Sequence, residues 1–244
     1  MTYVRVEGKR MTVDAFMQTK GLSVSGSLYL RACTALTSLP EGLSVGRSLD
    51  LRGCTALTAL PAGLSVRGSL NLHGCTALTT LPKGLAAGSW LDLSGCTALT
   101  SLPKGLSVDG SLSLGGCTAL TALPAGLSVR GSLNLHGCTA LTTLPKGLAV
   151  GGWLNLHGCT ALTSLPEGLS VGASIDLHGC TALTNIIRGG TDKRGYAFYG
   201  AHLRKGWRVL AGCRNFSAAQ ARRHWLAGSE CRALAEQVIA QFPT

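Results

Sequence analysis

Residues 69–82 read SLNLHGCTALTTLP, and this phrase recurs with small changes through most of the 244-residue chain. Its cysteine returns at a constant step of 21 residues, at Cys33, Cys54, Cys75, Cys96, Cys117, Cys138, Cys159 and Cys180. Eight copies of the unit S-L-x-L-x-G-C-T-A-L-T-x-L-P-x-G-L-S-V-x-G run from Ser27 to about Ile187. A fixed period of this length is typical of a solenoid, in which each repeat stacks on the next.

The unit itself predicts short strands joined by turns. In the LNL of residues 70–72, two leucines alternate with a polar residue, which is the period of a half-buried strand. Pro82 and Gly84 predict a turn, and residues 64–66 predict a second short extended segment. Because one unit cannot bury its own apolar face, neighbouring units must stack, with parallel strands about 4.8 Å apart. We therefore expect residues 27–187 to form an α/β solenoid of mostly β and loop structure.

The repeat resembles a known family. LNLHGCTAL at residues 70–78 is similar to the consensus L-x-x-L-x-L-x-x-(N/C)-x-L of leucine-rich-repeat proteins. The G-C-T-x-L-x-x-L-P phrasing is similar to short bacterial repeats and to those of plant immune receptors. Val66 departs from the consensus, because it lies four residues before Leu70 and not three. The resemblance implies parallel strands lining a concave face, and an interaction protein of bacterial or phage origin.

Parts of the array are exact duplicates. Residues 53–86 recur without a change at 116–149, a shift of 63 residues or three repeats. Such identity indicates duplication of units and weakens any inference that every exposed residue was selected individually.

The first 26 residues are expected to form an N-terminal cap. Val4 and Val6, followed by Met11 and Val13, predict a hairpin around residues 7–9 that closes the first coil.

Residues 188–244 differ in composition from the array. They hold 10 of the 22 Lys and Arg residues and 3 of the 11 Asp and Glu residues, a contribution of +7 to the net charge of +11. They also hold seven of the twelve aromatic residues. Strands are expected at residues 196–199 and 207–211.

Two helices should follow these strands, the first capped by Ser217 and running to Leu226 before Gly228, the second capped by Ser229. These elements predict a compact ββαα module, basic and rich in aromatic residues, docked as a cap on the last coil. GCRNF at residues 212–216 resembles small modules found behind repeat arrays in phage and bacterial proteins, and this resemblance implies no activity.

The polar positions of the SLxL segment should form columns on the concave face. A third column carries serine except at Trp90 and Trp153, and tryptophan is costly to expose unless it anchors a partner. The alternative is that each Trp covers a glycine-rich edge. The candidate partner-binding residues are Trp90, Trp153, Asp50, Asp92, Asn134, Asn155, Asp176, Arg31, Arg52, His136, His157 and His178.

Metal binding and catalysis are less favoured. His136, His157 and His178 should stack about 5 Å apart, but solvated histidines on strands are common, and we expect no metal site and no cofactor. The cysteine ladder could serve packing, disulfides or metal; inward-pointing thiols in a reducing compartment favour packing. No nucleophile, metalloprotease or phosphate-loop motif is present in the sequence. We expect a protein that is not an enzyme.

The leading functional hypothesis is a cytoplasmic scaffold, in the source cell or an infected host cell, that binds a protein partner. The N-terminal residues lack an apolar signal segment, and no membrane association is expected. The alternative is a nucleic-acid-associated protein using Arg204, Lys205, Arg208, Arg222 and Arg223, since positive charge with aromatic residues suits phosphate contact and base stacking. A structural spacer without a ligand is the third possibility.

Overall fold

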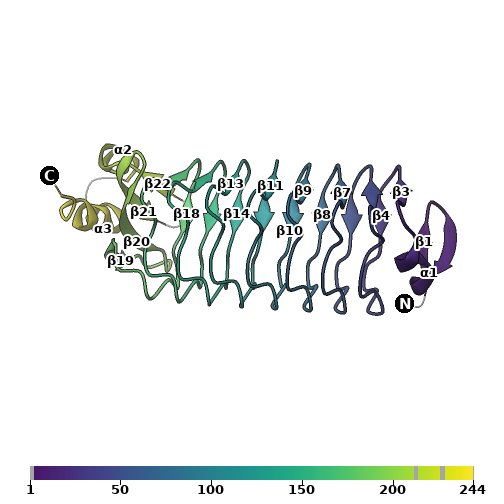
Figure 1. Cartoon of the computed structure of the whole chain (residues 1–244). Coiled ribbons are helices and arrows are strands. Elements are labelled where there is room, and N and C mark those ends of the chain that lie inside the picture. The colour runs from purple at the N-terminus through teal and green to yellow at the C-terminus, as the bar shows by residue number, and fades with distance from the viewer. Residues whose placement is uncertain (1–2, 212–213, 226–228, 244) are drawn as a thin grey trace.

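The computed structural model describes residues 3–211, 214–225 and 229–243. These residues form a parallel β-solenoid with a period of 21 residues, mostly strand and loop, with a hairpin and short helix at one end and a sheet with two helices at the other (Figure 1). We call each turn of the solenoid a rung. A solenoid of mostly strand and loop is confirmed, but the α/β class is wrong, because residues 19–211 contain strands and turns and no helix.

Two parallel sheets of eight strands each run through the described rungs, so the chain makes about seven full turns between the first and last strand of a sheet. The front sheet, from the SLxL segments, consists of β4 (Leu28–Tyr29), β6 (Leu49–Asp50), β8 (Leu70–Asn71), β10 (Leu91–Asp92), β12 (Leu112–Ser113), β14 (Leu133–Asn134), β16 (Leu154–Asn155) and β18 (Ile175–Asp176). The back sheet consists of β3 (Ser23–Val24), β5 (Ser44–Val45), β7 (Ser65–Val66), β9 (Ala86–Ala87), β11 (Ser107–Val108), β13 (Ser128–Val129), β15 (Ala149–Val150) and β17 (Ser170–Val171).

The register between rungs keeps every repeat position in line. Leu91 pairs with Leu70 on one side and with Leu112 on the other, and all three are fully buried. A shift of one residue would turn these leucines to the outside, so the hydrophobic pattern fixes the register. Gly74, just before the ladder cysteine, has a φ of +70°, a conformation that glycine adopts without steric cost.

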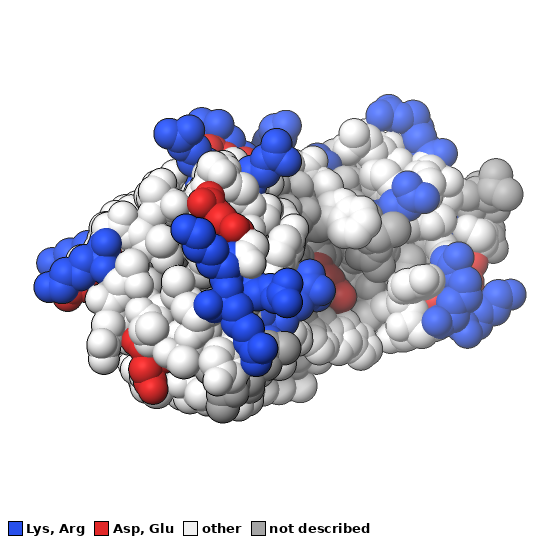
Figure 2. All heavy atoms as spheres, turned by 90° about the vertical axis from the view of Figure 1, so that its right-hand side faces the viewer, with Lys and Arg blue, Asp and Glu red and all other residues white. Residues whose placement is uncertain are grey.

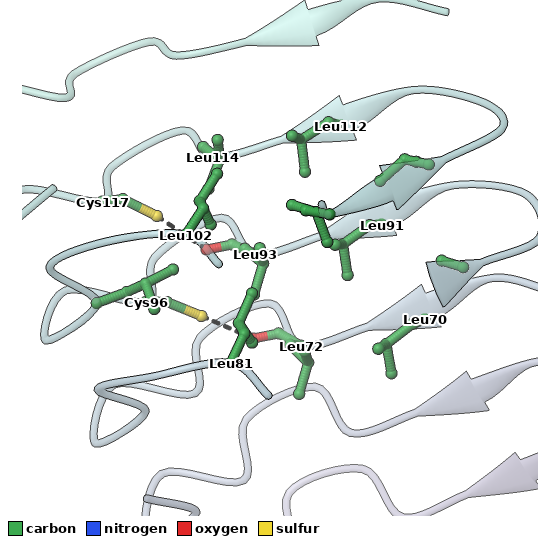
Figure 3. Packing of buried hydrophobic residues seen from close by; sticks show 14 of the residues in the cluster. Leu70, Leu72, Leu81, Leu91, Leu93, Cys96, Leu102, Leu112, Leu114 and Cys117 are labelled. Atoms are coloured by element: carbon green, nitrogen blue, oxygen red, sulfur yellow. Dashed lines mark hydrogen bonds between the residues drawn. The ribbon is translucent and has the colours of Figure 1, made fainter. Parts of the chain in front are cut away.

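The cysteine ladder lies inside the solenoid. All eight ladder cysteines are buried and free of disulfides. From Cys54 onward each thiol donates to the carbonyl of a leucine 24 residues earlier, as Cys96 does to Leu72 at 3.3 Å and Cys117 to Leu93 at 3.1 Å (Figure 3). The thiols therefore fill the core, as expected, and also satisfy a backbone acceptor in the neighbouring rung, which the sequence did not indicate.

The N-terminal end is a hairpin followed by a helix. Strands β1 (Tyr3–Val6) and β2 (Lys9–Thr12) pair antiparallel around Glu7 and Gly8, which both have positive φ, so the expected hairpin is confirmed. Val13 is not in the second arm, as we expected, but begins helix α1 (Val13–Gln18), because Thr12 accepts the Ala15 N–H and caps it. Figure 2, which looks onto this end, shows basic side chains at several places around it and few acidic ones.

The C-terminal module contains four strands, two more than expected. Its antiparallel sheet is β19 (Ile186–Thr191), β20 (Ala197–Leu203), β21 (Gly206–Ala211) and β22 (Arg214–Phe216), followed by α2 (Ala218–His224) and α3 (Glu230–Ile239). Gly189 and Gly190 both lie within β19. A Cβ at these positions would come within 2.7 Å of Val238 and 2.5 Å of Leu234, so the glycines let α3 pack onto the strand.

The helix caps of this module are confirmed. Ser217 accepts the Gln220 N–H and Ser229 accepts the Arg232 N–H. Helix α2 ends at His224, and Trp225 is extended, so the helix is two residues shorter than predicted. Leu226 and Gly228 lie outside the described residues.

The module packs against the last rung. Its Ala201, Leu203 and Leu210 belong to the same buried cluster as the leucines of the array. The Arg204 N–H donates to the Leu169 carbonyl at 2.9 Å, and the Arg188 guanidinium donates to the Cys180 carbonyl at 3.0 Å. Leu177, Cys180 and Leu183, which would otherwise face water at the end of the array, are buried.

Candidate binding surface and junction pocket

The second residue of each front-sheet strand forms a column of mostly polar side chains, and several of these accept backbone hydrogen bonds. Each predicted Asp or Asn in it accepts the N–H of the residue two positions later, at 2.9–3.2 Å. These acceptors are Asp50, Asp92, Asn134, Asn155 and Asp176. One oxygen of each side chain is therefore committed to shaping the turn after the strand.

Three of the predicted partner-binding residues form an ion-pair cluster. Arg31 Nε lies 2.6 Å and Arg52 Nη2 3.1 Å from Asp50 Oδ2, and Asp50 is only 6% exposed. Burial alone would raise the pKa of Asp50, but the hydrogen bonds from Arg52 and Arg31 outweigh it and hold the pKa below its ordinary value. Asp50 is therefore not available to a partner, whereas the half-exposed Arg31 and Arg52 share its one carboxylate and keep a net positive charge.

The predicted histidine stack is present. The ring centroids of His136 and His157 are 4.8 Å apart, and those of His157 and His178 are 4.9 Å apart. His157 Nδ1 lies 3.9 Å from Asp176 Oδ2. Within the described residues, no group of three or more His, Cys, Asp or Glu side chains is arranged to hold a metal ion.

Trp90 and Trp153 are both exposed, at 38% and 62%. They are 63 residues apart, which is the shift of the duplicated segment, so they occupy the same position three rungs from each other. Position alone therefore does not distinguish them. What differs is that Trp153 is in the rung before the last, within reach of the C-terminal module.

A pocket of about 470 Å³ opens where the front sheet meets the module. We call it the junction pocket. The array contributes Trp153, Leu154, Asn155, His157, Ser174, Ile175, Asp176, Leu177 and His178, and the module contributes Gly195, Tyr196, Ala197, Tyr199 and Leu210. The pocket thus brings together Trp153, Asn155, His157, Asp176 and His178 from the predicted set, and it leaves out Trp90 and the Arg31–Asp50–Arg52 cluster.

Asp192 and Tyr196 are the site residues that the sequence analysis missed. The buried carboxylate of Asp192 accepts the Tyr196 N–H at 3.0 Å and the Arg194 guanidinium at 2.8 Å. Burial alone would raise its pKa, but these hydrogen bonds lower it to about 2. Asp192 thereby holds the turn that presents half-exposed Tyr196 to the pocket. The phrase Asp192-Lys193-Arg194-Gly195 is a turn signal that could have revealed this hairpin.

The basic residues proposed for nucleic acid are only partly available. Arg204, Lys205 and Arg223 are exposed. Arg208 is not on the outside, as expected, but half-buried, where it donates to the Asn215 side chain at 2.9 Å. Arg222 is exposed yet paired with Glu236 at 2.9 Å.

No family model matches the chain, and comparisons with curated proteins and with solved structures give no significant match. Among the described residues, no helix has the length and apolar character to cross a membrane.

Proposed function

We propose that this chain is a leucine-rich-repeat protein that acts as a non-enzymatic scaffold in the cytoplasm and binds a protein partner on its front-sheet face. The observation that carries the proposal is Trp153, 62% exposed at a position that is serine in six of the eight rungs, on the wall of the junction pocket. Aromatic residues beside a concave site are the usual energetic centre of a protein interface.

The regular part of the face supports the same function. Stacked rungs provide a stiff platform, because the backbone of each front strand is hydrogen-bonded to the strands beside it. In the Asn and Asp column the Oδ1 atoms of Asn134, Asn155 and Asp176 shape the turns, so Asp176 has a second oxygen to offer a ligand and Asn155 has its side-chain amide N–H. A partner would then contact His136, His157 and Asn155 on the way to Trp153.

The test is capture of partners from lysate of the source cells by the immobilised full chain. Trp153→Ser should reduce capture of the specific partner by tenfold or more, whereas the matched Trp90→Ser should retain most of it, because Trp90 lies outside the junction pocket. Both variants should fold, because serine stands at this position in the other six rungs. Melting temperatures of the variants serve as the folding control. Equal capture by all three proteins would reject the proposal.

A nucleic-acid function remains the competing hypothesis, supported by the net charge of +11 and the exposed Arg204, Lys205 and Arg223. It is weaker because Arg208 and Arg222 have partners within the module. Binding of a single-stranded oligonucleotide that weakens steeply with salt and survives Trp153→Ser would favour it over the scaffold.

A further inference from the structure

The exposed aromatic residues divide into two groups. Among the described residues, a guanidinium lies over each exposed tyrosine: Arg10 is 4.0 Å from the ring centroid of Tyr3, Arg31 5.6 Å from that of Tyr29, and Arg194 5.2 Å from that of Tyr196. No such contact is made to Trp90 or Trp153 in the part of the chain that the structure describes. Tryptophan is the ring that attracts cations most strongly.

The charge of the junction pocket also favours a cation as its ligand. Asp176 is the only Asp or Glu among the described residues that line it, and no Lys or Arg lines it, although the chain carries a net charge of +11. Asp176 Oδ1 accepts the His178 N–H at 2.9 Å, while Oδ2 lies 3.9 Å from His157 Nδ1 and has no closer donor in the described residues. Its side chain is 49% exposed, so this second oxygen can be reached from the pocket.

Tyr196 contributes a second aromatic wall. Arg194 lies over this ring and pairs with Asp192 at 2.8 Å, so its positive charge is already compensated within the module. A compact cation entering between the wall of Trp153 and that of Tyr196 would meet aromatic surface and one carboxylate.

We propose that the junction pocket receives the cationic end of a lysine or arginine side chain of the protein partner, with Trp153 contacting the cation, Asp176 pairing with it and Tyr196 lining the pocket. This assignment rests on the proposed function and names the chemistry that the partner must present. A neutral or acidic side chain would leave Asp176 partly desolvated without compensation.

The experiment measures binding of N-acetyl-lysine amide to the full chain through the indole resonance of Trp153, which is assigned with Trp153→Ser. N-acetyl-norleucine amide is the matched neutral probe and N-acetyl-glutamate amide the acidic one, all at constant ionic strength. The lysine probe should bind saturably and about tenfold more tightly than either of the others. The Trp90 resonance should not move.

Two matched substitutions locate the carboxylate. Asp176→Asn should weaken the lysine probe about tenfold, and the fold should tolerate it, because Asn134 and Asn155 make the same turn contact in their rungs. Asp92→Asn, in the same column but outside the pocket, should have no effect. Equal binding of the lysine and norleucine probes, preference for the acidic probe, or an unchanged affinity in Asp176→Asn would each overturn the assignment.

The probe assay tests the cation assignment, and partner capture tests the proposed function, so the two can be distinguished. If the lysine probe binds as expected but capture does not depend on Trp153, the proposed function is wrong and the pocket chemistry stands. If capture depends on Trp153 but the probe shows no preference for the cation, the scaffold function stands and the cation assignment is wrong.

Discussion

The repeat array and the C-terminal module differ in how side chains obtain their roles. In the array, the position within the 21-residue unit decides whether a residue is buried, which is why Leu70, Leu91 and Leu112 share one environment. The module has no repeat, and each of its residues makes its own contacts. Trp90 and Trp153 occupy one repeat position, yet only Trp153 lines the junction pocket, because only Trp153 meets the module. The repeat produces the regular front-sheet face, and the junction pocket forms where the repeat ends and the module begins.

Removing the module should have the largest effect. A chain ending at Asn185 would expose Leu177, Cys180 and Leu183, which are now buried, and should lose the soluble monomer in size-exclusion chromatography with light scattering. The control is excision of residues 53–115, three whole repeats, which joins matching repeat positions and keeps both ends. A monomeric, soluble truncated chain would show that the module is not needed as a cap.

Within the array, Leu133→Ala should lower the free energy of unfolding by about 3 kcal/mol, because the side chain is fully buried between two rungs. Ser128→Ala, on the outer side of the back sheet, should change it by less than about 0.5 kcal/mol. Alanine already stands at the equivalent positions Ala86 and Ala149. Denaturant unfolding measures both, and similar losses in the two variants would contradict the buried register.

The cysteine ladder should make stability fall at high pH. Burial raises the pKa of Cys54 to about 11 and that of Cys75 to about 12, from an ordinary value of 9.0. The unfolded chain ionises first, so the stabilisation is complete below pH 9 and is lost progressively as the pH rises toward 11–12. The melting temperature should drop over this window, and by a smaller amount in a variant with Cys54→Ala and Cys75→Ala, which keeps the other six ladder cysteines.

Thiol labelling at pH 8 provides the corresponding kinetic contrast between the two regions. The buried ladder cysteines should react far more slowly than half-exposed Cys231 of the module, and unfolding should remove the difference. Site-resolved mass spectrometry measures each rate. Rapid native labelling of the ladder would contradict a closed core.

The smallest effect concerns the turn that carries Tyr196. The pKa of Asp192 is lowered to about 2, so its stabilisation of this turn is fully present above pH 4 and is lost as the pH falls through 2. The Tyr196 resonances should shift over that range while the array signals remain, since the turn is local to the module. Asp192→Asn should show the shifted state already at neutral pH.

The array could be predicted from the sequence because the same 21-residue pattern occurs eight times. Its Leu, Cys and Gly residues stand at fixed positions, so they determine which residues of each rung are buried and where the turns lie. The hairpin at Glu7–Gly8 and the helix caps at Ser217 and Ser229 also follow from local chemistry. The strand through Gly189 and Gly190 could not be predicted from local chemistry. The two glycines are needed there because α3 packs closely against the strand, and no local sequence pattern encodes that contact. For the same reason the sequence predicted Trp153 as an anchor but not the pocket beside it, which depends on how Asp192 turns the chain.

The most direct test of the central claim, that binding is concentrated at the junction of array and module, is site-specific photo-crosslinking in the source cells. A benzophenone amino acid replaces Trp153, Trp90 or, on the back sheet, Ser128. A strong crosslink to a protein partner is expected from position 153, little from position 90 and none from position 128. Equal crosslinking from all three positions, or crosslinking from 90 or 128 without 153, would contradict it.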